Sequence, residues 1–450
     1  MKAKQRDETA VLADDFALER VPPAGRTPML EILWVELGIV TAMSEFVVAS
    51  ALGYGMTFWR ALLATLVGTL LLLLVSVLVG VAGSNEGLPT GLLARWSGFG
   101  RYGSMLISFI VVIGCTAWFG VQNSICAEAI VRATHFHVGM ALASFLSGSI
   151  VILIASLGIH WVSKTASFVV PLFTVLVIYG CYRVLSSSSL SNIVLAPAPG
   201  PSLTLATGAS MVVGGAMLGG IVAPDFTRFC RTGKDVLWVM LISLIVGQFG
   251  LGTAAILLSH AARTQDVIAI IFGVAGWLGL AIVVLATLKL NDANLYSASL
   301  HAANAIEIVF GHKMNRGILT IILGSVGILF SVFGILQHIV GFLLILGVAV
   351  PPIGGVLIVD YFLLARDRQS LAVTRASNSL PPSSESVNPV ALLAWLAGFL
   401  VGESLHIGVA SVNSIIAAGI VYYTVMKTMA ILSKRPIKYF RTVPTISSQS

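Results

Sequence analysis

The sequence predicts an all-α integral membrane protein with twelve transmembrane helices, on the evidence of its charge content, hydropathy and segment pattern. The 450 residues include only 26 Lys and Arg and 19 Asp and Glu, together 10%, against roughly a quarter in soluble proteins. Apolar residues make up 57% of the chain, and the mean hydropathy is +0.96. Since one crossing takes about 20 apolar residues, a dozen helices account for most of the chain. We expect the lipid bilayer as a partner, and neither a soluble enzyme nor a nucleic-acid-binding protein.

Twelve apolar segments are separated by short polar or Pro/Gly-containing turns. They cover residues 31–55, 60–82, 104–130, 139–161, 165–185, 205–224, 235–260, 268–290, 317–333, 335–362, 388–410 and 412–432. Residues 294–310 are amphipathic and too polar to cross, so we expect them at the inner membrane surface or packed beneath the bundle. The Ser/Pro-rich residues 369–387 are expected to form a flexible inner loop.

The positive charges are distributed unevenly between alternate loops. If both termini lie inside, the inner segments hold 21 Lys and Arg and the outer segments hold four, namely Arg60, Arg132, Arg183 and Arg263. This bias is the one that membrane insertion follows. It predicts a multi-pass protein of the plasma membrane, of the bacterial inner-membrane type, with both termini in the cytoplasm. The remaining positive residue, Lys289, lies inside an apolar segment.

The first segment contains two acidic residues, Glu36 and Glu45, within apolar surroundings. Ionisable groups inside a membrane are costly and mark functional sites by default. With Thr41 and Ser44 between or beside them, they suggest a helix that unwinds there and exposes backbone groups. The alternative for Glu36 is a cap on an inter-helix contact near one interface.

The third segment carries Trp118 and Gln122, four residues apart and so on one helical face. An indole plane and an amide can together sandwich and read a flat heterocycle. Tryptophan is often an interfacial anchor, but Trp118 lies near the middle of its segment. Glu128 lies further along and is either a gate residue or interfacial.

The sixth segment contains two glycine pairs, Gly214–Gly215 and Gly219–Gly220. They either allow close helix packing or mark a discontinuous helix. If segments 1–5 and 6–10 are inverted repeats, the first and sixth segments correspond. Interrupted helices at matched positions are the best sequence indication of a transporter's midplane site.

The eighth segment ends with Lys289, Asn291, Asp292 and Asn294. Lys289 either reaches to the membrane interface or is buried and titrates at a useful pH. The sequence contains no nucleophile elbow, phosphate-binding loop or metal-type spacing. We therefore expect a protein that is not an enzyme and that binds no cofactor or metal.

Five motifs resemble those of the bacterial cytosine permeases of the nucleobase–cation symporter-1 family. They are TGLLARWSGFG (90–100), WFGVQ (118–122), APDFTRFCR (223–231), NDANLYSASL (291–300) and PPIGGVLIVDY (351–361). The resemblance implies a leucine-transporter-like fold. In it, residues 28–185 and 186–365 are inverted repeats of five helices, and residues 388–432 are two added helices. Residues 1–27, 366–387 and 433–450 are then cytoplasmic.

The resemblance also implies a substrate site at the membrane midplane. Trp118 would stack on the base, and Gln122 would read its polar edge. The other positions implied are Ala42 on the first helix, Gly215, Ala216 and Leu218 on the sixth, and Asn291 and Asn294 on the eighth. Relatives carry aromatics where this chain has Ala42 and Ala216, so a wider pocket and a bulkier heterocycle than cytosine are expected. Glu45 would accept a hydrogen bond from an amino group.

Relatives hold sodium with main-chain carbonyls that correspond to Gly38 and Thr41 and with helix-eight side chains. Those side-chain positions here are Ala286, Lys289 and Leu290, which offer no oxygen. We therefore expect Lys289 to replace sodium and transport to be proton-coupled or sodium-independent. Its partner would be Glu36, Glu45 or Asp292.

These inferences predict a monomeric secondary transporter that imports a small nucleobase-like heterocycle by alternating access. Arg95 and Asp360 lie in matching motifs and are expected to serve structure or gating at the inner face. One alternative substrate is a vitamin precursor such as a hydroxymethylpyrimidine or a pyridoxine-like ring. A channel or a membrane-embedded enzyme is the alternative from another class.

Overall fold

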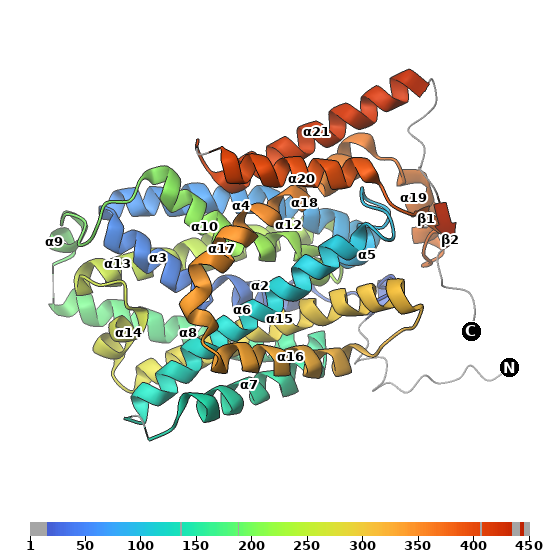
Figure 1. Ribbon diagram of the computed structural model, residues 1–450. Helices are drawn as coiled ribbons and strands as arrows, with labels where there is room; N and C mark the ends of the chain where they lie inside the picture. The colour runs from blue at the N-terminus through green and yellow to red at the C-terminus, as the bar shows by residue number, and fades with distance from the viewer. Residues whose placement is uncertain (1–15, 136, 188, 406, 434–441, 445–450) are drawn as a thin grey trace.

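The computed structural model describes residues 16–135, 137–187, 189–405, 407–433 and 442–444, and these are almost entirely helical (Figure 1). Eight stretches are helical, long and apolar enough to cross a membrane within these ranges. They contain α4 (Phe58–Glu86), α6 (Ser104–Ala133), α8 (Ile159–Ser187), α10 (Leu205–Ile221) with α11 (Ala223–Thr227), α12 (Gly233–Ile242) with η2 (Ser243–Phe249) and α13 (Gly250–Ala262), α15 (Leu278–Phe310), α17 (Ile339–Ala349) with α18 (Pro351–Ile358) and η4 (Val359–Leu364), and α21 (Ala410–Ser433).

The first apolar segment is one span broken into two helices, α2 (Met29–Val40) and α3 (Met43–Gly55), bent by 47°. The interruption at Thr41 and Ala42 confirms the unwinding expected beside Glu45. Three apolar helices are shorter, α7 (Met140–Ser156), α16 (Arg316–Val332) and α20 (Pro389–Ser404). All twelve predicted apolar segments therefore contain helix. The remaining short elements are η1 (Pro23–Gly25), α5 (Thr90–Leu93), α9 (Leu190–Val194), α14 (Val267–Ala275) and η3 (Ile335–His338).

The structure joins residues 294–310 to the preceding apolar segment in one helix, and their location at the inner surface or beneath the bundle stays a prediction. They form the second half of α15, which runs unbroken for 33 residues. The polar side chains in this half have buried partners instead of water. Asn304 and Glu307, for example, both accept hydrogen bonds from Arg95. The preceding break lies instead between α14 and α15, where Gly276 has a φ of 55°.

The expectation of a flexible loop at 369–387 is wrong for much of that segment. Residues Arg368–Ala376 form α19, and the strand β1 (Ser383–Glu385) pairs antiparallel with β2 (Thr442–Pro444). Buried polar contacts fix this segment. The carbonyl of Glu385 accepts from the backbone N–H of Arg101, and the Glu385 carboxylate pairs with Arg366.

The glycine pairs of the sixth segment lie within α10 and do not break it. The interruption comes just after them, at Val222 with φ −86° and ψ 7°, before Pro224. A Cβ on Gly220 would lie 2.9 Å from Ser76 Oγ of α4. Close helix packing is therefore the role that the second glycine pair fulfils.

The helices α6 and α15 pack along one another, α2 and α3 contact α15, and α10 contacts α3, α4 and α6. Figure 1 shows α20 and α21 side by side at one edge of the molecule, next to α18. We name one end of the helix bundle the terminal face. There the backbone of Val21 bonds to Gly87 after α4 and that of Thr27 bonds to Phe229 after α11, and the β1–β2 pair lies at the same end (Figure 1).

Candidate functional site

A cavity lies where the α2–α3 break meets α6, α10 and α15. Centres of water molecules can occupy about 70 Å³ of it, several times the roughly 10–15 Å³ that one water needs. It is mostly apolar with a few polar groups, as small-molecule sites are. Its lining is Glu36, Ile39, Val40, Ser44, Glu45, Leu72, Ser76, Cys115, Trp118, Gly215, Ala216, Leu218, Gly219, Gly220, Val222, Phe226, Met240, Leu244, Leu290, Ala293, Asn294 and Ser297.

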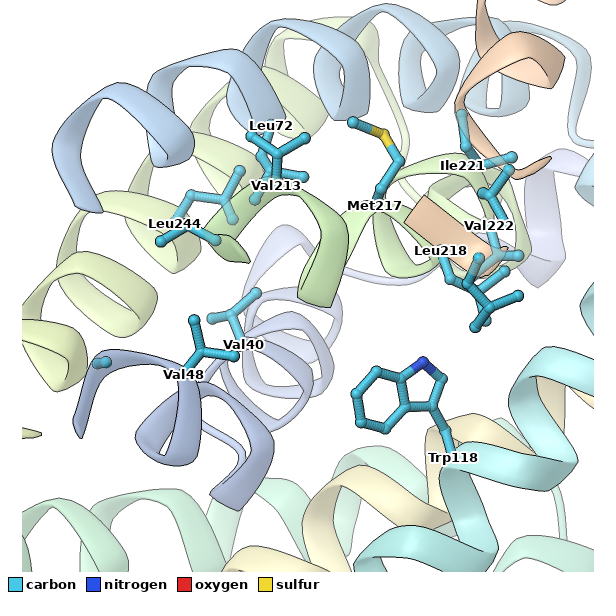
Figure 2. Packing of buried hydrophobic residues seen from close by; sticks show 14 of the residues in the cluster. Val40, Val48, Leu72, Trp118, Val213, Met217, Leu218, Ile221, Val222 and Leu244 are labelled. Atoms are coloured by element: carbon cyan, nitrogen blue, oxygen red, sulfur yellow. The ribbon is translucent and has the colours of Figure 1, made fainter. Parts of the chain in front are cut away.

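Trp118 supplies the one large aromatic plane that α6 contributes to this lining. Its position, fourteen residues after the start of α6 at Ser104 and fifteen before the end at Ala133, places it near the middle of the helix. The indole projects from α6 into the space between α3 and α10, with Leu218 nearby (Figure 2). The side chain is only 6% exposed and meets Phe342 edge-to-face at 5.7 Å between ring centres. A flat ring can stack on such an indole.

Gln122 and Ala42 are buried but do not line this cavity. Neither amide atom of the Gln122 side chain has a hydrogen-bond partner among the described residues, while its backbone carbonyl accepts from Thr287 Oγ1 at 3.4 Å. The predicted roles of Gln122 and Ala42 in substrate contact remain predictions.

Two carboxylates, Glu36 and Glu45, face the cavity from either side of the α2–α3 break. Glu36 is 5% exposed, and its Oε1 has no hydrogen-bond partner in the part of the chain that the structure describes. Glu45 is 8% exposed and accepts from Gln248 Nε2 at 3.4 Å. The lining position of Glu36 favours a functional role over a cap at the interface.

The wall formed by α10 presents Gly215, Ala216, Leu218, Gly219 and Gly220. A Cβ on Gly215 would lie 3.9 Å from Glu45 Oε1, so this wall faces α3 across the cavity. No side chain of this wall is aromatic, because Ala216 stands where the resemblance implies a ring.

From α15, the cavity receives Leu290, Ala293, Asn294 and Ser297. Asn294 contacts the cavity and donates to Asn291 Oδ1 at 3.2 Å, while Asn291 itself donates to the Phe119 carbonyl on α6. Asn291 therefore connects the two helices and positions Asn294 rather than lining the cavity.

Gly38, Thr41 and Asp292, three of the predicted coupling residues, are not among the residues that line the cavity. Asp292 is fully buried, and neither of its carboxylate oxygens has a partner among the described side and main chains. Gly38 lies in the last turn of α2, where carbonyls lack intrahelical partners, and the Thr41 hydroxyl donates to the Leu37 carbonyl. The side chain of Lys289 lies outside the described residues.

A second cavity adjoins the first, since Ser44 and Trp118 line both. It continues past Ile125 to Glu128, Arg132 and Asp266, near the end of α6 that is remote from the terminal face. Arg132 pairs there with Glu128, one turn away, and lies 3.5 Å from Asp266. The two cavities together lead from Trp118 toward the face opposite the terminal face.

On the other side of the cavity, toward the terminal face, the charged side chains are buried and paired. Arg95 and Arg101 both contact Glu307. Burial lowers the pKa of Arg95, and the adjacent Glu307 carboxylate opposes that shift. Asp225 accepts from the Thr90 backbone N–H at 2.9 Å and lies 3.4 Å from His301 Nε2. These contacts join α5, α11 and the end of α15.

The N-terminal segment adds a second group of contacts at the terminal face. Arg20 pairs with the buried carboxylate of Glu86, which also receives Arg375 and the hydroxyl of Tyr361. Arg26 donates to the carbonyls of Ser84 and Cys230. This segment therefore fastens α4, α11 and α19 together.

Asp360 belongs to a third group of contacts at this face. It accepts from Arg366 at 2.6 Å and from the Tyr422 hydroxyl at 2.9 Å. Burial works against the charged form of Arg366, but Asp360, Tyr422 and Glu385 together outweigh it and raise the Arg366 pKa. Arg95 and Asp360 thus both lie in buried ion pairs, as a structural role requires.

Sequence reasoning missed several polar residues of the site, among them Ser76, Gln248 and Ser297. Gln248 is the clearest omission, because a lone amide within an apolar segment is a recognisable signal. Glu86 and Glu307 were missed because their arginine partners are distant in sequence.

The family of permeases for cytosine and purines, uracil, thiamine and allantoin matches residues 30–432 of this chain. The chain is 29% identical to the cytosine permease of Escherichia coli K12 over 415 residues, covering 91% of this chain and 93% of that protein. It is 24% identical to the hydantoin permease of Microbacterium maritypicum, covering 89% and 86% of the two chains.

Solved structures agree on the fold. Mhp1, a nucleobase–cation-symport-1 family transporter solved in a closed conformation with bromovinylhydantoin, superposes with a TM-score of 0.75. That comparison has 21% identity and covers 94% of this chain and 96% of Mhp1. A sodium-coupled sialic acid symporter gives a TM-score of 0.64 at 11% identity, covering 96% and 97% of the two chains. The match over most of its length shows that this chain belongs to the cytosine/purine permease family, whose members are membrane transporters and not enzymes.

Proposed function

We propose that this secondary transporter imports a nucleobase-like heterocycle by alternating access. The observation that carries the proposal is the cavity at the α2–α3 break, with the Trp118 indole on one side and the small residues of α10 on the other. A ring stacked on Trp118 gains about 1–3 kcal/mol. Interrupted helices beside a cavity supply free backbone groups and helix ends to a substrate.

The alternating-access part of the proposal uses the two sides of the cavity. The second cavity provides a path from the face remote from the termini, and the paired charges at the terminal face close the other path. We assign the terminal face to the cytoplasm on the distribution of Lys and Arg. The two five-helix halves, 28–185 and 186–365, would move against each other as inverted repeats. The protein is proposed to be a twelve-helix monomer of the inner membrane that binds no cofactor.

The substrate is proposed to be bulkier than cytosine, because Ala216 in the cavity lining stands where relatives are expected to carry an aromatic ring. A substituted vitamin-precursor ring is the alternative. A thermal-shift screen of the purified protein against nucleobases, hydantoins and vitamin precursors tests both, since a ligand that binds only the native state raises stability. A shift with at least one flat heterocycle is expected, and none from any would refute the proposal.

We further propose that transport is proton-coupled or sodium-independent. Sodium requires several oxygen ligands, and the positions 286, 289 and 290 carry Ala, Lys and Leu. Lys289 would take the place of the ion. Asp292, three residues later on the same helix and without a hydrogen-bond partner among the described residues, is its proposed counterion.

Replacement of sodium by choline at constant pH is expected to leave uptake unchanged, and its collapse would refute sodium independence. Lys289→Ala is expected to abolish uptake driven by a pH gradient. Lys164→Ala, at an exposed position of α8, is the matched control. Full uptake by the Lys289 variant would refute the role of this lysine.

A further inference from the structure

We infer that the cavity selects heterocycles that present an amino group beside a ring nitrogen, or a positive charge, to Glu36 and Glu45. This inference rests on the proposed function and narrows its substrate class. Such rings are amidine-like: the amino group donates, and the ring nitrogen, which is an acceptor while neutral, becomes a second N–H donor along the same edge when the ring binds with a proton. Rings with a carbonyl in place of the amino group, and anionic rings, are expected to bind more weakly.

The charge of the lining is the first argument. Among the residues whose side chains the structure describes, it contains two carboxylates and no Lys, Arg or His. The two carboxylates approach from different helices, Glu36 near the end of α2 and Glu45 in the first turn of α3. A ligand between them therefore meets acceptors from both sides of the break.

The second argument is a contrast with other buried acids of the same chain. Several carboxylates near the terminal face lie against an Arg or His side chain, namely Glu86, Asp225, Glu307 and Asp360. Among the described residues, Glu36 and Glu45 make no such ion pair. Removing a carboxylate from water without a partner is costly. The Arg or His partners that these acids have at the terminal face are lacking, among the described residues, for the two acids at the cavity.

The helix ends near Glu36 and Glu45 stabilise the two carboxylates to different extents. Glu45 is the third residue of α3, where the positive end of the helix dipole favours a carboxylate. Gln248 adds one neutral hydrogen bond to it. Glu36 precedes the negative end of α2 and has an unpartnered oxygen, so it has the greater need of a donor from the ligand. Glu36 is therefore the stronger selector of the two.

The chemistry of an amidine-like edge fits these groups. A carboxylate accepts two parallel N–H donors in the manner of charge-assisted bidentate pairs. Trp118 adds a face on which a planar or cationic ring stacks. In the oxo counterpart the ring nitrogen carries an N–H, but the neighbouring carbonyl is an acceptor, so one buried carboxylate oxygen faces an acceptor and stays unpaired. We expect amino compounds to bind about 10- to 150-fold more tightly than their oxo counterparts.

The test uses three pairs of probes that differ only at this edge. They are adenine and hypoxanthine, cytosine and uracil, and 4-amino-5-hydroxymethyl-2-methylpyrimidine and its 4-oxo counterpart. Affinities are measured on the full-length protein in lipid nanodiscs by thermal-shift titration. In every pair that binds, the amino member is expected to bind at least ten-fold more tightly. Equal or tighter binding of the oxo member overturns the inference.

Variants locate the selection. Glu36→Gln and Glu45→Gln are each expected to reduce the amino-over-oxo preference, with the larger loss in Glu36→Gln, while the unliganded protein keeps its melting temperature. Glu31→Gln, on α2 but outside the cavity lining, is the matched control with an unchanged preference.

A preference that survives in both cavity variants overturns the inference. The inference is also overturned if Glu36→Gln and Glu45→Gln change only the pH dependence of uptake, because the two carboxylates would then carry protons and not select the ring. Binding of both members of a pair with equal affinity refutes this inference but leaves the proposed function standing. Failure of all six compounds and of the wider heterocycle screen refutes both.

Discussion

Replacement of Trp118 is the most informative single perturbation of the cavity. The indole is 94% buried by its surroundings yet lines both cavities, so it is already fixed where a ring would stack. Stacking of a base on an aromatic side chain contributes about 1–3 kcal/mol, which corresponds to roughly 5- to 150-fold in Kd. Trp118→Ala is therefore expected to weaken binding by this factor, and Trp118→Phe by less because a ring remains.

The assay is a binding titration in nanodiscs with the heterocycle that gives the largest thermal shift in the screen. Trp277→Ala is the matched control, because that indole is 68% exposed and lies outside the cavity. Melting temperatures without ligand separate lost binding from lost folding. A folded Trp118→Ala protein that binds within two-fold of the unaltered protein would refute the stacking role.

Two further predictions concern packing and charge at the terminal face. Gly83→Val is expected to lower the melting temperature, because even a Cβ there would lie 2.5 Å from Pro224 Cβ and overpacking costs about 1–3 kcal/mol. Gly250→Ala is the control and should leave the melting temperature unchanged, because a Cβ there would meet no atom within 4 Å. Equal effects of the two changes would contradict the close contact at Gly83. Glu86→Gln is expected to destabilise by up to about 3–5 kcal/mol, because it removes the charge opposite a buried arginine. The same change at exposed Glu403 should leave the melting temperature unaltered, and an unaltered Glu86 variant would argue against the ion pair.

Local signals in the sequence predicted the central features of the site. Polar residues within the first apolar segment indicated the α2–α3 break, because hydrocarbon tolerates them only beside a cavity or irregular backbone. The mid-segment position of Trp118 distinguished it from an interfacial anchor. Glu45, Gly215, Ala216, Leu218 and Asn294 were likewise predicted and line the cavity.

Features that depend on distant partners were not predictable in the same way. Helical spacing places Trp118 and Gln122 on one face, but they are about 6 Å apart along the axis, so a neighbouring helix can cover one and leave the other at the cavity. An amphipathic pattern such as that of residues 294–310 does not show whether its polar side chains face water or buried polar groups of other helices. The partners of Glu307, Arg95 and Arg101, lie about two hundred residues away.

The most direct test of the account is accumulation of a labelled heterocycle by the purified protein in proteoliposomes, with the compound that the thermal-shift screen selects. With an acidic exterior and no sodium, we expect saturable uptake to an internal concentration above the external one, and its loss in the Trp118→Ala variant. Flux that does not saturate and stops at equal concentrations would indicate a channel, and would contradict the account.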